Sequence, residues 1–210
     1  MGYLRRSTRS WYLGSIKTYM IMENINLNEL RDRAYKTACE HGFHDKELSN
    51  EHLLCLIISE LMEAVEADRK GKHADRESFK SSYEDEEPHD DVNFKYCFEK
   101  YIKDSYEDEL SDTVIRCLDL VGLKQIYLPT LDSIDAPGWD EEDFKEPIPE
   151  FAYFLCQELL DECSPLDIRI YNVIEQIFVY CRFNCIDIEW FIEQKMRYNE
   201  LRPMLNGKRY

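Results

Sequence analysis

Two pairs of carboxylates have the spacing of residues that share one face of a helix. Glu60 and Glu63 form the first pair, and Glu109 and Asp112 form the second. Residues three apart on a helix project to the same side, so each pair brings two negative charges together. Apolar residues flank both pairs, and acids at the edge of a core are costly unless a cation neutralises them. The four acids therefore predict a site for Mg²⁺ or Mn²⁺, whose preferred ligands are oxygens.

The abundance of acidic residues supplies a competing explanation for these pairs. The chain contains 43 Asp and Glu residues, so pairs three apart also arise by chance on solvated helix faces. Spacing alone leaves both explanations open.

A third segment, near the end of the chain, concentrates cations in an acidic protein. Lys195, Tyr198, Asn199 and Arg202 are spaced so that they fall on one helical face. Lys and Arg fit phosphate contacts, whereas Tyr and Asn fit contacts to a base or ribose. The alternative is a face that pairs with surface acids, and residue chemistry alone does not separate the two.

Charge and composition narrow the classes of partner. The formal net charge is −17, which repels nucleic-acid backbones and anionic membranes. No stretch reaches the roughly 18 apolar residues that a membrane-spanning helix requires. The eight cysteines lack the Cys-x-x-Cys spacing of zinc sites. We therefore expect reduced core thiols, a cytoplasmic location, and neither a membrane nor a nucleic acid as partner.

The elements that must position these residues are predicted to be helices. Apolar periodicity, together with cap residues such as Asn26 and either Ser49 or Asn50, predicts an all-α bundle in a single domain over 23–210. Two polar insertions, 72–93 and 127–149, interrupt it, and residues 1–22 are expected to lie outside the fold as an N-terminal extension. The predicted helices cover 27–41, 51–70, 94–126 with a break near Asp104 and Ser105, 150–163, 166–184 and 186–201.

In combination, the motifs resemble a known family. Glu60-x-x-Glu63 followed by Glu109-x-x-Asp112 is similar to the ExxE…ExxD signature of MazG-like, all-α nucleoside triphosphate pyrophosphohydrolases. The segment 195–203 resembles the last helix of bacterial and phage-type members. The resemblance covers roughly residues 27–210. It departs from the family in the longer gap between the two motifs and in the extra 127–149 segment.

The resemblance implies a reaction and a set of roles. It implies cleavage of an NTP or dNTP between the α- and β-phosphates, giving a monophosphate and pyrophosphate, with Mg²⁺ as cofactor and Mn²⁺ as a substitute. The four acids would hold the metal and act in catalysis, and Lys195 and Arg202 would bind the leaving diphosphate. Arg116 is expected to orient one of the acids.

Two further expectations complete the sequence-based picture. The resemblance implies a homodimer or homotetramer, and an apolar run near the end of the chain predicts the surface that would be buried there. The alternative function is an inactive acidic scaffold or nucleic-acid mimic, although a mimic needs acids on a surface rather than within apolar helices. The apolar run consists of Phe178, Val179, Tyr180, Phe183, Ile186, Ile188, Trp190 and Phe191.

Overall fold

The described part of the chain is helical, as predicted. The computed structural model describes residues 25–131 and 147–207, so the predicted extension 1–22 and most of the 127–149 segment lie outside the described residues. Within these ranges the only β pairing is one isolated antiparallel bridge, between Ile25 and Leu131. The α-helices are α1 (Leu27–Glu40), α2 (Asn50–Arg69), α3 (Arg76–Phe79), α4 (Asp91–Tyr101), α5 (Tyr106–Leu123), α6 (Ile148–Leu160), α7 (Leu166–Phe183) and α8 (Ile188–Glu200).

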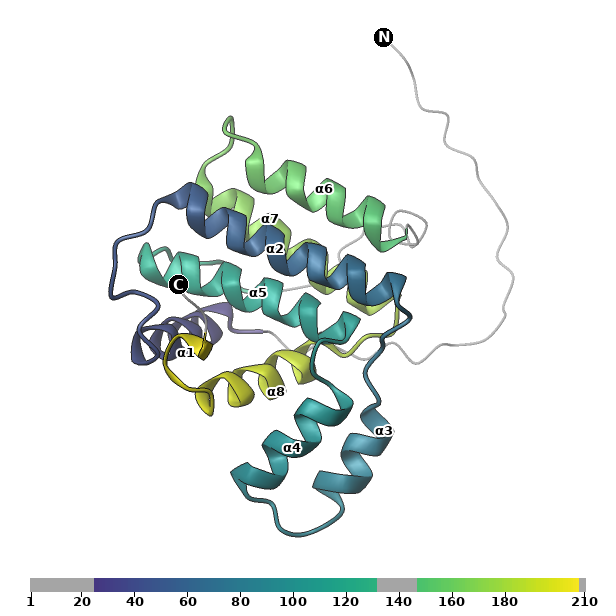
Figure 1. Cartoon of the computed structure of the whole chain (residues 1–210). Coiled ribbons are helices and arrows are strands. Elements are labelled where there is room, and N and C mark those ends of the chain that lie inside the picture. Colours follow the sequence, from purple (N-terminus) through teal and green to yellow (C-terminus); the bar gives the residue numbers. More distant parts are fainter. Residues whose placement is uncertain (1–24, 132–146, 208–210) are drawn as a thin grey trace, which may run out of the picture.

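Helix α5 is the centre of the bundle. Fourteen of its 18 residues are buried, and it packs against α1, α2, α7 and α8. Figure 1 shows α2 between α5 and α6, with α1 and α8 on the other side of α5. At Gly122, an added Cβ would come within 2.6 Å of Cβ of Tyr35, so this glycine allows α1 to approach α5 closely.

The helix boundaries follow the local signals in the sequence. Asn26 and Ser49 accept hydrogen bonds from backbone N–H groups in the first turns of α1 and α2, as predicted. The predicted break between α4 and α5 is also present. There Asp104 has φ of 57°, and the Ser105 side chain caps α5 by accepting from the Asp108 N–H. No helix among the described residues has the length and apolarity to cross a membrane.

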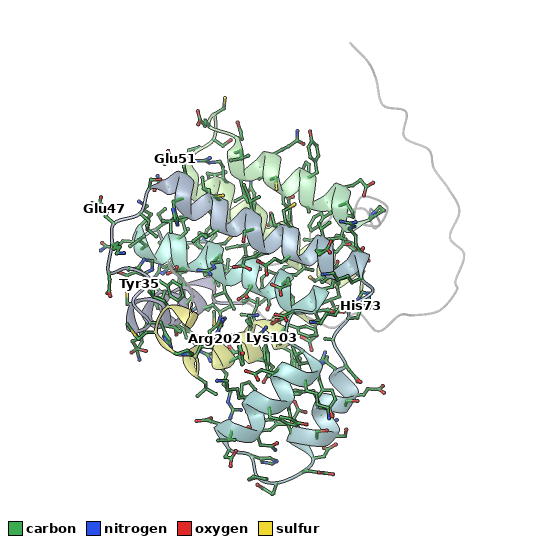
Figure 2. All side chains as sticks on the ribbon, in the orientation of Figure 1. Tyr35, Glu47, Glu51, His73, Lys103 and Arg202 are labelled. Carbon is green, nitrogen blue, oxygen red and sulfur yellow. The ribbon has the colours of Figure 1, made fainter. Side chains whose placement is uncertain are left out.

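The polar insertion predicted over 72–93 is helical in its central part. It contains α3 and a π-helical turn, η1 (Lys80–Glu84), which together with α4 form a hairpin over residues 76–101. The hairpin projects from the bundle in Figure 1, and in Figure 2 His73 and Lys103 lie where the chain enters and leaves it. Aromatic packing explains why this segment is folded. Phe79, Tyr83 and Phe94 form one apolar cluster with residues of α8.

The surface predicted for oligomer contacts is largely internal. Phe178, Val179, Tyr180, Ile188 and Phe191 are buried within the single chain, so this run does not supply the exposed apolar surface that was expected. The helices of one chain suffice to cover it. The homodimer or homotetramer therefore stays a prediction without this support.

The cysteines are free, as predicted, but only some of them are core thiols. Cys97, Cys117 and Cys181 are buried, whereas the other five are partly or fully exposed. Burial raises the pKa of the Cys117 and Cys181 thiols above the usual range. These two side chains thus act as small apolar core groups.

Candidate metal and substrate site

Three of the four predicted metal ligands converge. Glu60 and Glu63 on α2 and Glu109 on α5 each offer a carboxylate oxygen, and these oxygens all lie within 4.8 Å of one another. Glu60 and Glu109 are each only 4% exposed, while Glu63 is exposed and opens the cluster to solvent. Asp112 does not belong to this group, so the predicted four-acid site becomes a three-acid cluster.

The packing of α2 against α5 places these acids. Leu61 and Ala64 on α2 and Leu110 and Val114 on α5 are fully buried in one apolar core. Each acid is adjacent in sequence to a core residue or one turn from it, so the carboxylates emerge at the edge of the core. The helical spacing that predicted the pairs therefore also brings the two helices' acids face to face.

Glu109 has a strongly raised carboxyl pKa. Burial raises the pKa of its carboxyl to about 9, and the neighbouring acids Asp112, Asp108 and Glu60 add to the rise, although Lys195 acts in the opposite direction. No residue in the described part of the chain donates a hydrogen bond to this carboxylate. Burial therefore favours the protonated form of Glu109 unless a cation is bound beside it.

Lys195 does not face a phosphate site, which corrects the sequence-based expectation. Its ammonium lies 2.7 Å from Oδ2 of Asp108 and 2.9 Å from Oδ2 of Asp112, and the residue is 3% exposed. Burial opposes the charge of Lys195, but Asp108, Asp112 and Glu109 outweigh it and raise the lysine pKa. Burial likewise opposes ionisation of Asp112, yet Lys195 together with Arg116 and Arg202 lowers the pKa of that carboxyl.

Tyr198 is also turned inward, contrary to the predicted contact with a base. Its ring stacks on Phe98 of the hairpin with centroids 4.4 Å apart. Its hydroxyl donates a hydrogen bond to Oε1 of Glu99, over 2.9 Å. The residue is 3% exposed, so its ring has no face left for a nucleobase. Tyr198 therefore fixes α8 to the hairpin.

Asn199 and Arg202 line a pocket, whereas their predicted contacts to a nucleotide stay a prediction. The pocket lies between α1, α5 and α8, and Glu60 and Asp112 form the part of its wall nearest the acid cluster. Oδ1 of Asn199 is buried and has no hydrogen-bond partner among the described residues. Arg202 forms no ion pair within the described ranges, so its guanidinium is available to an anion.

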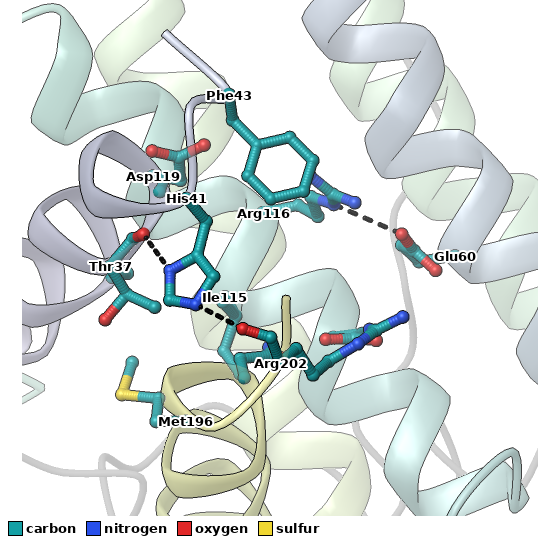
Figure 3. A pocket seen from close by; sticks show the side chains of 13 residues that line it. Thr37, His41, Phe43, Glu60, Ile115, Arg116, Asp119, Met196 and Arg202 are labelled. Atoms are coloured by element: carbon teal, nitrogen blue, oxygen red, sulfur yellow. Dashed lines mark hydrogen bonds and ion pairs between the residues drawn. The ribbon is translucent and has the colours of Figure 1, made fainter. Parts of the chain in front are cut away.

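Several residues that line this pocket were not predicted from the sequence (Figure 3). The two ring nitrogens of His41 lie 2.8 Å from the Thr37 carbonyl oxygen and 2.9 Å from that of Arg202, so His41 ties the end of α1 to the end of α8. Phe43 covers the Arg116 guanidinium at 5.5 Å. Asp119 binds His44 over 2.7 Å. The sequence did contain one indication of Asp119, which falls seven residues after Asp112 and therefore lies on the same helical face.

Comparisons with protein-family models, with curated proteins and with solved structures gave no match. The acid cluster and the adjoining pocket are therefore the features from which a function can be inferred.

Proposed function

We propose that the chain is a Mg²⁺-dependent nucleoside triphosphate pyrophosphohydrolase of the MazG-like type, which converts an NTP or dNTP to the monophosphate and pyrophosphate. The observation that carries the proposal is the position of the three-acid cluster beside a pocket with two guanidinium groups. Glu60 belongs to both, and Arg116 and Arg202 line the pocket. A cation site next to anion-binding groups suits a triphosphate.

The acid cluster fits a divalent cation. Three carboxylates provide the hard oxygen ligands that Mg²⁺ and Mn²⁺ prefer. The buried Glu109 carboxylate has no other partner among the described residues and tends to hold a proton. A cation bound there would displace this proton and relieve the repulsion between the acids.

Within this proposal the protein residues have different roles. A metal ion bound at the cluster supplies charge neutralisation at the phosphate and lowers the pKa of a nearby water. Glu60, Glu63 and Glu109 hold that ion, and Arg116 and Arg202 bind phosphate oxygens of the leaving group. Water adds to the α-phosphorus and releases a proton to the solvent, the bond from that phosphorus to the bridging oxygen breaks, and pyrophosphate leaves with the electron pair.

The remaining pocket residues suit the nucleoside. The Asn199 amide has an unsatisfied buried oxygen that accepts a donor from a base or sugar. Phe43 and His41 provide flat walls in the same pocket. Free cysteines support a reducing, cytoplasmic location as part of this proposal.

The alternative, an inactive acidic scaffold or nucleic-acid mimic, draws on the exposed acids at the tip of the hairpin, such as Glu84 and Asp91. Glu60 and Glu109 favour the hydrolase instead, since each is 4% exposed. A partner that binds a surface gains nothing from acids buried between helices, whereas a metal site does.

Pyrophosphate release over a panel of NTPs and dNTPs, with Mg²⁺ and with excess chelator, tests the proposal. Glu60→Gln and Glu63→Gln should each lower turnover by about two decades or more, because each removes one unit of ligand charge. Glu66→Gln is the matched control, since Glu66 lies one turn further along α2 and pairs on the surface with Arg69 and Lys70. Full turnover in excess chelator would refute the proposal.

A further inference from the structure

The acids around the proposed metal site fall into two groups that are neutralised differently. Glu60, Glu63 and Glu109 approach one another at the edge of the core, and exposed Glu63 opens this group to solvent. Asp108 and Asp112 share the Lys195 ammonium, at 2.7 and 2.9 Å. One turn of α5 therefore carries both groups, with Glu109 facing the open cluster and Asp108 and Asp112 facing the lysine.

The lysine is fixed in its place by the surrounding structure. The side chains of Lys195 and Asp108 are 4% and 1% exposed. Oδ2 of Asp108 also accepts a hydrogen bond from the Asp104 backbone N–H, over 2.9 Å. Removing the ammonium would leave the buried carboxylate of Asp108 and the partly buried carboxylate of Asp112 without their shared cation, which is unfavourable. A divalent ion would have to overcome this cost to take the place that the ammonium holds between the Oδ2 atoms of Asp108 and Asp112.

We propose that the site takes one divalent cation, at Glu60, Glu63 and Glu109, and that the Lys195 ammonium fills the place of a second cation at Asp112. This inference rests on the proposed function, which requires a metal at the cluster. It makes Asp112 and Lys195 positioning residues rather than metal ligands. Asp112 then serves to hold Lys195 beside the cluster and to attract Arg116 and Arg202 electrostatically.

The charges of the site support a single divalent ion. The carboxylates of Glu60, Glu63, Glu109, Asp108 and Asp112 are opposed by the cations of Lys195, Arg116 and Arg202. Asp119, which also lines the pocket, is set apart from this group because it pairs with His44 over 2.7 Å. One divalent ion brings this set to neutrality. A second would leave an excess of positive charge in a half-buried site before any substrate arrives, which costs desolvation energy without a counter-charge.

Mn²⁺ binding to the full chain, measured without nucleotide by electron paramagnetic resonance and calorimetry, tests the proposal. We expect one Mn²⁺ per chain. Glu109→Gln should weaken binding by about tenfold or more, because a ligand charge is lost. Asp112→Asn should change the Kd by less than about threefold. Two Mn²⁺ per wild-type chain, or a loss of about tenfold in Asp112→Asn, would overturn the proposal.

Lys195→Met provides the complementary measurement. With the ammonium gone, Asp108 and Asp112 should admit a second Mn²⁺, and a folded variant that still binds only one would contradict the inference. Should this variant fail to fold, the comparison of Asp112→Asn with Glu109→Gln decides alone. One Mn²⁺ without pyrophosphate release would support the inference and reject the proposed function. Pyrophosphate release by a chain that binds two Mn²⁺ would support the proposed function and reject the inference. A chain that binds no Mn²⁺ would reject both the inference and the proposed function.

Discussion

The Nε atom of Arg116 on α5 donates a hydrogen bond to Oε1 of Glu60 on α2, over 3.1 Å. This contact joins the acid cluster to the pocket, because Glu60 belongs to both and Arg116 lies under the Phe43 ring. Under the proposed function, Arg116 would compete with a metal ion for one oxygen of Glu60. With a metal and a triphosphate bound, the same guanidinium would meet a phosphate oxygen.

Arg116→Gln should separate metal binding from turnover. We expect Mg²⁺ to bind somewhat more tightly, since Glu60 is released and a repelling charge is lost. In contrast, kcat/KM should fall by one to two decades, because a charge-assisted contact is worth about 1.5–3 kcal/mol. Calorimetry and steady-state kinetics measure the two effects. Arg33→Gln, which removes a surface arginine paired with Glu193 and Glu200, is the control. Unchanged kcat/KM in Arg116→Gln would show that this guanidinium does not meet the substrate.

Lys195→Met should destabilise the fold. The sequence-based interpretation of Lys195 as a phosphate ligand predicts a nearly unchanged melting temperature. The buried pairs with Asp108 and Asp112 predict a loss of about 3–5 kcal/mol in the free energy of unfolding, since two acids remain uncompensated. Urea denaturation measures this loss. Lys36→Met removes an exposed lysine of α1 and should change stability by less than about 1 kcal/mol. Equal stability of the two variants would contradict the buried ion pairs.

Glu109 should make the metal-free protein less stable as pH rises. Its folded-state pKa of about 9 lies above the ordinary value of 4.5, so between these values the folded state holds a proton that the unfolded state releases. The contribution of protonated Glu109 to the free energy of unfolding is fully present below about pH 4.5 and is lost as pH rises through about 9. With chelator present, Glu109→Gln should therefore gain stability over wild type as pH increases, measured by urea denaturation from pH 5 to 9. Saturating Mg²⁺ should reverse this ordering, because it binds the ionised carboxylate. A pH-independent difference in chelator would argue that Glu109 is already ionised.

Local patterns predicted the helices and the acid pairs, because caps and helical periodicity depend on nearby residues. The expected proximity of Glu60, Glu63 and Glu109 is present in the structure, since a spacing of three on a helix fixes a shared face, whereas their role as metal ligands stays a prediction. Periodicity does not predict whether a polar helix face lies toward solvent or packs against the rest of the protein. Lys195 and Tyr198 share a face, but their partners Asp108 and Glu99 lie 87 and 99 residues earlier in the chain.

The same limit explains the hairpin and the pocket. The acidic run over 84–91 favoured a solvated segment over the helical turn that precedes it. The aromatic residues that stabilise this turn pack against residues of α4 and α8, which local sequence does not indicate. His41 offered no motif, and its role depends on the Arg202 carbonyl, 161 residues away. Contacts of this kind follow from tertiary packing, which a single sequence does not display.

Tyr198 tests whether the inward face of α8 is structural. Tyr198→Phe removes the hydrogen bond to Glu99 and should cost about 1 kcal/mol of unfolding free energy. Tyr198→Ala also removes the stacked ring and should cost about 3–5 kcal/mol. A double-mutant cycle with Phe98→Ala, followed by urea denaturation, should give a coupling energy of about 0.5–1.5 kcal/mol for the stacked pair.

Kinetics of the same variants separates this structural role from stacking on a nucleobase. Tyr198→Phe should keep kcat/KM close to that of wild type, because the hydroxyl of Tyr198 faces the hairpin rather than the pocket. A ring that stacks on a base makes the opposite prediction, in which Tyr198→Ala raises KM while the unfolding free energy stays constant. That result, combined with no coupling to Phe98, would show that Tyr198 turns outward when substrate binds, and the pocket would then have to be redrawn around it.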